Sequence, residues 1–272
     1  MRPLQWVKNF FVFAPLLFTG RYTDELSLRE TLTAFAVFCI ASAAVYVLND
    51  LRDIEADRLH PQKSQTRPLA TAEVAASSAV ALLVVLVAIL SVALVARPAL
   101  VPSIVGYITI NIAYSMYLKT QPVLDIFTVA AGFVLRIYAG ASAIDVPVSS
   151  WMFVTGFSLA LYLAAMKRLS ELKETGTGSR AVLEMYSENL VERFALISAI
   201  SSLTFYSLFT LTAKPALIST IPLVLFGVMR YWYVADRFKV GQSPTDALVR
   251  DPQLVLVGVV WLALVIVGIQ QA

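Results

Sequence analysis

The chain has 272 residues, of which 58% are hydrophobic and 14% charged, with a formal net charge of +3. Soluble domains are roughly half apolar, with about a quarter of their residues charged, whereas the mean hydropathy here is +0.75. This composition excludes an ordinary soluble domain and predicts an integral membrane protein. Long continuous apolar runs favour helices over a transmembrane barrel, whose strands alternate polar and apolar residues.

The apolar residues fall into nine segments. They cover residues 5–19, 30–49, 74–96, 99–118, 122–143, 149–168, 193–213, 215–233 and 253–270. A crossing needs about 20 apolar residues, so the first segment is short enough to lie partly at the interface. It is read as a helix of the mature protein because Lys8 interrupts it and no small-residue cleavage site follows. We predict one transmembrane domain, residues 1–272, of about nine helices.

The placement of Lys and Arg predicts the orientation. With nine crossings, sixteen of these cations lie on the side of the N-terminus and four on the other side. Basic residues are enriched in cytoplasmic loops. The pattern therefore predicts a multi-pass protein of the inner (plasma) membrane with a cytoplasmic N-terminus. The remaining cation, Arg136, falls inside the fifth segment.

Two residue types limit the chemistry. The chain has one cysteine, Cys39, and one histidine, His60. An internal disulfide and a His-rich metal site are therefore excluded. Any metal would use oxygen ligands, which favours Mg²⁺, with Mn²⁺ as the alternative.

An acidic cluster ends the second segment, in "YVLNDLRDIEADRLHPQKSQTRPLA". Asp50, Asp53 and Asp57 have i, i+3, i+7 spacing, which places them on one face of a helix. Three such carboxylates repel one another and remain ionised only when a cation lies between them. Asn49 and Tyr46 lie in the preceding turn and add a carbonyl and a hydroxyl. The pattern predicts a magnesium site that also binds substrate phosphates.

The alternative interpretation is a solvated helix end. Two observations disfavour it. The cluster begins at the membrane boundary, where bare negative charge is unfavourable. It is also followed by Arg58, Lys63 and Arg67, which suits a polyanion that bridges the metal and the cations.

The motif N-D-x-x-D-x-x-x-D, here Asn49 to Asp57, resembles the first signature of the UbiA-type membrane prenyltransferase superfamily. The resemblance covers nearly the whole chain. It implies an all-α bundle of about nine transmembrane helices with a polar cavity that faces the cytoplasm. It also implies Mg²⁺ bound at this motif and at a second Asp-rich motif after the sixth helix.

The second motif is where the chain departs from that pattern. No aspartate occurs between Asp145 and Asp236, and the sixth segment ends in Lys167 and Arg168. The acidic residues of the following loop are Glu171, Glu174, Glu184 and Glu188. A cationic site in place of the second metal suits a bare anion such as a lipid phosphate.

Several blocks together resemble the decaprenyl-phosphate phosphoribosyltransferase branch of the superfamily. They are "RPLQWVKNFFVFAPLLF", the acidic stretch, "YSMYLKTQPVLDIFTVAAGFVLRIYAGA" and "LAAMKRLSEL". The resemblance implies transfer of 5-phosphoribose from phosphoribosyl pyrophosphate (PRPP) to a polyprenyl phosphate, with release of pyrophosphate, for cell-wall arabinan synthesis. It implies these two partners, and we expect no nucleic acid. The possibility of a homo-oligomer stays open.

The resemblance also implies roles for individual residues. The catalytic residues would be Asp50, Asp53 and Asp57. The metal would be bound by Asn49 and Asp53, with Asp50 and Asp57 supporting it directly or through water. The PRPP ligands would be Lys8, Tyr46, Lys63, Lys119 and Arg136. The polyprenyl phosphate would meet Lys8, Lys63, Lys167 and Arg168. Weaker candidates are Arg67 and Tyr114, while Asn111 and Tyr186 could equally be polar packing residues.

Some of these residues have simpler explanations. Arg136 could pair with Asp125, which lies eleven residues away on the same helix face. Lys8 could extend toward the interface, and Lys119 and Lys167 could be ordinary cytoplasmic helix ends. These alternatives remain open from sequence alone.

Three other functions compete with the phosphoribosyltransferase. A prenyltransferase acting on an aromatic acceptor predicts the second Asp-rich motif that is missing. A transporter predicts internal repeats and broken helices, and no repeat is visible. A structural subunit leaves three co-facial aspartates without a purpose.

Overall fold

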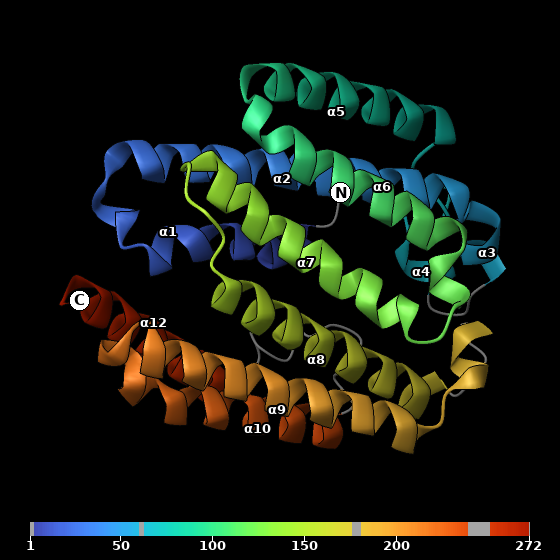
Figure 1. Ribbon diagram of the computed structural model, residues 1–272. Coiled ribbons are helices and arrows are strands. Elements are labelled where there is room, and N and C mark those ends of the chain that lie inside the picture. Colours follow the sequence, from blue (N-terminus) through green and yellow to red (C-terminus); the bar gives the residue numbers. More distant parts are fainter. Residues whose placement is uncertain (1–2, 60–62, 176–180, 239–250, 272) are drawn as a thin grey trace.

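The computed structural model describes residues 3–59, 63–175, 181–238 and 251–271, and these contain helices and connections but no strand. Eight of the helices in this part of the chain are long and apolar enough to cross a membrane. They are α2 (Glu25–Arg52), α5 (Ala76–Ala96), α6 (Val101–Met116, with η3, Pro98–Leu100), α7 (Leu124–Ala143), α8 (Ser150–Thr175), α9 (Glu188–Thr212), α10 (Ile221–Phe238, with η7, Pro215–Thr220) and α12 (Pro252–Gln270). The prediction of an all-α membrane bundle is confirmed (Figure 1).

Short elements precede or connect these helices. They are η1 (Pro3–Phe13), α1 (Ala14–Phe18), η2 (Arg21–Thr23), α3 (Ile54–Leu59), α4 (Lys63–Thr66), η4 (Leu118–Thr120) and η6 (Ala181–Met185). The eight later apolar segments all coincide with long helices. Their predicted ends differ by up to seven residues, because several helices continue as polar turns beyond the apolar run. The helix α8, for example, extends to Thr175, seven residues past the predicted end.

The first segment is a 3₁₀ helix that runs into one turn of α-helix, not the α-helix that the sequence suggested. Its burial follows the three-residue period of a 3₁₀ helix. Asn9 and Val12 are fully buried, whereas Val7 and Phe10 are 38% and 58% exposed. Because a 3₁₀ helix rises about 2.0 Å per residue, against about 1.5 Å for an α-helix, Pro3–Phe18 extends about 30 Å. That length matches the hydrocarbon core of a bilayer, so this short segment is long enough to be a ninth crossing.

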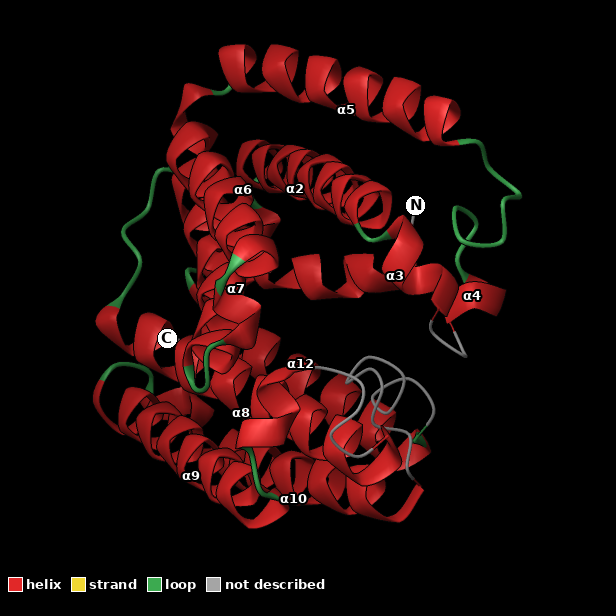
Figure 2. Ribbon diagram, turned by 90° about the vertical axis from the view of Figure 1, so that its right-hand side faces the viewer, coloured by secondary structure: helices red, strands yellow, loops and turns green. Residues whose placement is uncertain are grey.

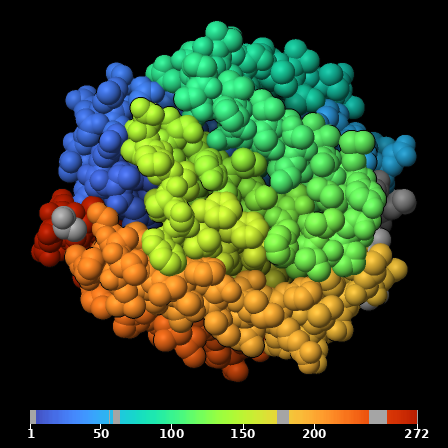
Figure 3. Space-filling model, in the orientation of Figure 1, coloured from blue at the N-terminus to red at the C-terminus, as the bar shows by residue number. Residues whose placement is uncertain are grey.

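The helices differ in how deeply they lie in the bundle. In the most apolar stretch of α2, 61% of residues are buried, and 56% in α7, but only 17% in α5. Thus α2 and α7 form the centre, while α5 packs mainly on α2 at one side (Figure 2). On the opposite side α8 and α9 lie together with α10 and α12 (Figures 1 and 2). Figure 3 shows one face on which these layers form a continuous surface.

One glycine explains how η1 approaches the centre. A Cβ atom on Gly140 of α7 would lie 1.9 Å from the carbonyl oxygen of Val12. Only a residue without a side chain permits such contact between two backbones. The N-terminal segment is therefore packed into the bundle between α2 and α7.

Candidate active site

The acidic motif lies where α2 ends. Asp53 follows the last helical residue, Arg52, and its backbone N–H still donates to the carbonyl of Asn49 at 3.0 Å. The chain then bends into α3, so the three aspartates do not continue on one straight helix as the spacing suggested. The backbone N–H of Asp57 donates to the carbonyl of Asp53 at 2.8 Å. This turn keeps the acidic residues close together at the polar end of the bundle.

Arg67 supplies the cation that the spacing of the carboxylates required. Its Nη1 donates to Asp50 Oδ1 at 2.7 Å and to Asp57 Oδ2 at 2.6 Å. The side chain of Asp57 is only 5% exposed, while those of Asp50 and Arg67 are 21% and 23% exposed. The sequence had ranked Arg67 as a weak candidate. The structure places it between two of the four predicted metal ligands.

The other two predicted metal ligands are Asn49 and Asp53. Asn49 Oδ1 accepts a hydrogen bond from Ser115 Oγ at 2.6 Å. In the described part of the chain, the half-buried carboxylate of Asp53 makes no hydrogen bond or ion pair with another side chain. One free carboxylate and one oriented amide oxygen are a donor set that Mg²⁺ accepts, because this ion usually binds through one or two carboxylates plus substrate phosphates.

Within the described residues, no three His, Cys, Asp or Glu side chains converge as a ready metal site. The carboxylates of Asp50 and Asp57 contact the guanidinium of Arg67. The residues present therefore fit Mg²⁺ held by Asn49, Asp53 and a bound diphosphate. They do not form an all-protein cage.

A second buried ionic network lies at the start of α7 and the end of α8. Arg168 Nε donates to Asp125 Oδ2 at 2.6 Å, Nη1 to Glu171 Oε2 at 2.6 Å, and Nη2 to Tyr114 Oη at 2.8 Å. Tyr186 Oη donates to Asp125 Oδ1 at 2.7 Å. Burial raises the pKa of the Tyr186 phenol, so it stays protonated and keeps this bond. Asp125 is fully buried and its charge is compensated by Arg168.

This network changes the interpretation of the last turns of α8, which contain Lys167 and Arg168. The sequence predicted a cationic site at Lys167 and Arg168 that would meet a lipid phosphate. The side chain of Arg168 is 3% exposed and forms ion pairs with two carboxylates. Its guanidinium on α8 therefore links Tyr114 of α6 with Asp125 of α7. The side chain of Lys167 is 31% exposed, and its Nζ lies 3.8 Å from Glu171 Oε1. Of the two cations, Lys167 is the one that remains accessible.

Arg136 does not pair with Asp125, as one of the alternatives from sequence suggested, because Asp125 forms its ion pair with Arg168. Arg136 Nε donates to Asn9 Oδ1 at 2.8 Å and Nη1 donates to the Gly132 carbonyl at 2.6 Å. The rings of Phe38, Tyr107 and Phe133 surround its guanidinium with centroids 4.9 to 5.3 Å away. Among the described residues no carboxylate contacts it, and it is 4% exposed.

Asn9 is the residue that sequence reasoning missed. Its amide joins three elements: Oδ1 accepts from Arg136, and Nδ2 donates to Cys39 Sγ of α2 at 3.1 Å. Two polar residues inside apolar runs, Asn9 and Arg136, were the available signal, because polar groups in a membrane protein find one another. The predicted PRPP ligand Lys8 is the neighbour of Asn9 and is half-buried.

The remaining predicted residues are distributed as follows. Tyr46 is half-buried on α2, four residues before Asp50. Lys119 is half-buried in η4 and makes no hydrogen bond or ion pair with a described side chain. Lys63 begins α4, but its side chain lies outside the described ones, as does all of His60. Asn111 Nδ2 donates to the carbonyl of Tyr107 on its own helix at 2.7 Å, which fits the packing alternative.

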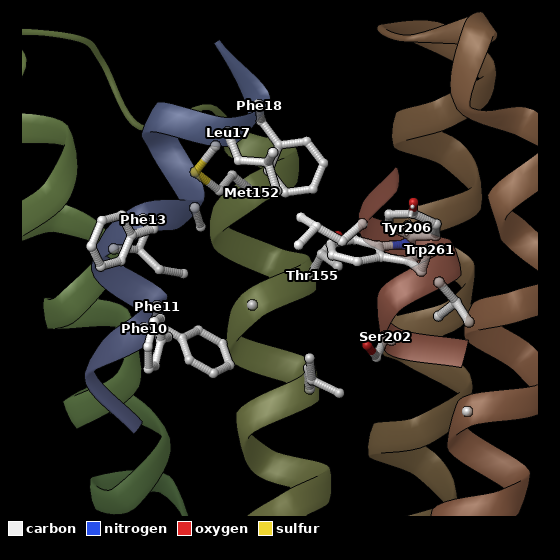
Figure 4. Close-up of a pocket in the computed structure, with 18 of the residues that line it drawn as sticks. Phe10, Phe11, Phe13, Leu17, Phe18, Met152, Thr155, Ser202, Tyr206 and Trp261 are labelled. Atoms are coloured by element: carbon white, nitrogen blue, oxygen red, sulfur yellow. Dashed lines mark hydrogen bonds between the residues drawn. The ribbon is translucent and has the colours of Figure 1, made fainter. Parts of the chain in front are cut away.

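An apolar groove of about 830 Å³ opens beside the N-terminal segment. Figure 4 shows Phe10, Phe11 and Phe18 on one wall, facing Tyr206 and Trp261 across the gap. The walls come from η1 and α1 on one side and from α8, α9, α10 and α12 on the other. Sequence reasoning did not predict this groove, because its wall residues also look like ordinary lipid-facing or core positions.

Comparisons with known proteins agree with these observations. The profile of the UbiA prenyltransferase family matches residues 10–249. Over 96% of its length the chain is 34% identical to a decaprenyl-phosphate phosphoribosyltransferase of Mycolicibacterium smegmatis, and it covers 88% of that protein. The protein of the same name from Corynebacterium glutamicum is 30% identical over 99% of the chain, with 85% of that protein covered.

Among solved structures, a UbiA homologue from Archaeoglobus fulgidus bound to DMAPP and Mg²⁺ superposes with a TM-score of 0.74. The match covers 100% of this chain and 98% of that one at 21% identity, a level that establishes the fold. The match to the family profile, the curated relatives and the helical bundle agree. The chain belongs to the UbiA prenyltransferase family.

Proposed function

We propose that this protein transfers the 5-phosphoribosyl group of PRPP to a polyprenyl phosphate, releases pyrophosphate, and so supplies a precursor for cell-wall arabinan. The observation that carries this proposal is the identity of 34% with decaprenyl-phosphate phosphoribosyltransferase over nearly the full chain. The substrates of that relative come to this chain as part of the proposal.

The geometry of the polar end supports this choice of donor. A prenyl diphosphate enzyme with two metals needs free carboxylates at two positions. Here the acidic groups near the end of α8, Asp125 and Glu171, are compensated by Arg168. Oxygen ligands that no cation occupies remain at Asp53 and at Asn49, whose Oδ1 accepts only from the Ser115 hydroxyl. This arrangement favours one metal-bound diphosphate and leaves Lys119 and Lys167 accessible for further phosphate groups.

The reaction requires little proton transfer. An oxygen of the lipid phosphate forms a bond to C1 of the ribose, while the bond between C1 and the pyrophosphate oxygen breaks and pyrophosphate leaves with the electron pair. The attacking phosphate is already an anion, so no general base is needed. When bound, Mg²⁺ would neutralise charge on the leaving pyrophosphate. The role of Asn49 and Asp53 is to hold that metal, and Lys119 would bind the departing oxygens.

The apolar groove supports a lipid acceptor. Its walls are almost entirely aromatic and aliphatic, and it begins beside Phe10, two residues from Lys8. A polyprenyl tail in the groove would leave the phosphate near the polar end of the bundle. The excess of Lys and Arg on the N-terminal side supports a cytoplasmic location for that end, where PRPP is a soluble metabolite.

The test is an assay of purified protein with PRPP labelled in the ribose, with and without polyprenyl phosphate. We expect label in the lipid fraction and stoichiometric pyrophosphate only when both substrates and Mg²⁺ are present, and we expect Asp53→Asn to abolish both. A parallel reaction uses geranylgeranyl diphosphate and an aromatic acid. Prenyl transfer there at a comparable rate, or no labelled lipid from PRPP, would refute the proposal in favour of the prenyltransferase alternative.

A further inference from the structure

The guanidinium of Arg67 lies between two carboxylates of the aspartate motif, where a bound metal ion would be expected. A single nitrogen, Nη1, contacts one carboxylate oxygen of Asp50 and one of Asp57, at 2.7 and 2.6 Å. A guanidinium and a divalent cation compete for such oxygens, because each takes up the same lone pairs. The two cannot both contact Asp50 Oδ1 and Asp57 Oδ2 at full strength.

The rest of the Arg67 side chain is available. Within the described residues Nε and Nη2 make no hydrogen bond or ion pair, and the side chain is 23% exposed. These two nitrogens form the edge of a guanidinium that binds phosphate oxygens in pairs. The backbone of Arg67 is fixed by a turn, in which its carbonyl accepts from the N–H groups of Ala70 and Thr71, both at 2.9 Å. The side chain can therefore change partners while the chain around it stays in place.

Charge at the motif favours such a change. Asp50, Asp53 and Asp57 carry three negative charges when ionised, and the single guanidinium of Arg67 contacts two of them. Removing Arg67 from a nearly buried carboxylate without replacement is unfavourable. A bound diphosphate with its metal supplies both a new anion for Arg67 and a new cation for Asp50 and Asp57.

We propose that Arg67 exchanges partners during donor binding. Without the donor it occupies Asp50 and Asp57 and keeps divalent cations weakly bound. When a diphosphate arrives, Arg67 moves to the phosphate oxygens and releases both carboxylates to the metal. The metal and the diphosphate then bind with positive coupling, which acts equally in both directions. The inference rests on the proposed function only in that the donor carries a diphosphate.

The first measurement uses Mn²⁺ alone, followed by the electron paramagnetic resonance signal of the free ion in titrations of purified protein without donor. We expect Arg67→Gln to bind Mn²⁺ about tenfold more tightly than the wild type or better, the effect of losing one competing charge-assisted contact. Arg58→Gln is the matched control. Arg58 is exposed on the neighbouring α3, and we expect its loss to leave Mn²⁺ affinity unchanged.

The second measurement is the affinity for labelled pyrophosphate in Mg²⁺ and in EDTA. The ratio of the two affinities is the coupling, which we expect to be large in the wild type and to fall about tenfold or more in Arg67→Gln. Arg67→Lys keeps the charge without the bidentate edge, so we expect near-normal Mn²⁺ affinity with reduced coupling. It also serves as the readable variant if Arg67→Gln does not fold.

Unchanged or weaker Mn²⁺ binding by Arg67→Gln, or unchanged coupling in both variants, would overturn the exchange. Neither probe contains a ribose or a prenyl group. The outcome is therefore independent of whether the transfer assay supports PRPP as the donor, and the two proposals can fail separately.

Discussion

The close contact between Gly140 and Val12 predicts a strong effect from adding one methyl group. In Gly140→Ala the new Cβ would lie 1.9 Å from the carbonyl oxygen of Val12, 2.8 Å from its carbon and 3.2 Å from its Cα. Cβ atoms essentially never lie closer than 3.0 Å to a non-bonded heavy atom of another residue. The N-terminal segment must therefore retreat by about 1.1 Å, the difference between 3.0 and 1.9 Å.

The retreat is unfavourable because all three atoms belong to the backbone and no side chain can rotate away. Overpacking of a well-packed core destabilises by about 1–3 kcal/mol, and by more when the backbone must shift. The same movement stretches the hydrogen bond from Arg136 to Asn9 on the same buried stripe, and a bond to a charged group contributes about 1.5–3 kcal/mol. We expect a total loss of about 3 kcal/mol or more.

The assay is thermal unfolding of the purified protein in detergent and in lipid nanodiscs, with transfer activity measured below the transition. The control is Gly258→Ala, because a Cβ on Gly258 of α12 would have nothing within 4 Å. We expect Gly258→Ala to melt like the wild type and Gly140→Ala to melt much earlier. If the two variants melted together, the close approach of η1 to α7 would not exist in the folded protein.

The remaining predictions concern the charged residues. Asp53→Asn should fold normally yet lose nearly all Mg²⁺-dependent transfer, and EDTA should do the same to the wild type; full turnover in EDTA would remove the metal from the mechanism. Asp125→Ala should lower the free energy of unfolding by about 3–5 kcal/mol, because it leaves the buried guanidinium of Arg168 with less charge compensation. Its effect should add to that of Arg136→Ala, because the two residues are not partners. A double variant no less stable than either single variant would show that Asp125 and Arg136 do form an ion pair. The pKa of Asp251 is lowered chiefly by its hydrogen bond from Arg230. The ionised carboxylate therefore contributes its full stabilisation above the unfolded-state pKa, and this stabilisation is lost as the pH falls below about 4. In Asp251→Asn, the plot of unfolding free energy against pH should lack this loss.

Much of the fold was predictable because lipid imposes a simple rule. Each crossing must satisfy its own backbone hydrogen bonds, so a run of apolar residues of the right length identifies a helix, and eight runs did so. The first run was different. Its period of three residues and its contact with Gly140 depend on partners far away in the chain, and a 3.6-residue template does not detect them.

The candidate site was predictable in composition but less so in pairing. The aspartate motif predicted Mg²⁺ among the carboxylates, and that stays a prediction. The structure places the guanidinium of Arg67, only a weak candidate from sequence, between Asp50 and Asp57. Sequence spacing suggested Asp125 as a partner for Arg136, since both lie on α7. In the folded protein Asp125 instead forms an ion pair with Arg168 of α8. Spacing along one helix cannot rank such partners against those from another helix, because several cations lie within reach.

The 3₁₀ character of the first segment also limits how the chain can change in length. In a 3₁₀ helix each residue turns the chain by one third of a circle, so residues three apart lie in line. With Asn9 and Val12 held in place, deleting Val7 would move Trp6 onto the exposed row that Val7 shares with Phe10. Deleting three would keep every residue upstream on its row and only shorten the crossing by about 6 Å. Viable insertions and deletions in this segment should therefore come in threes.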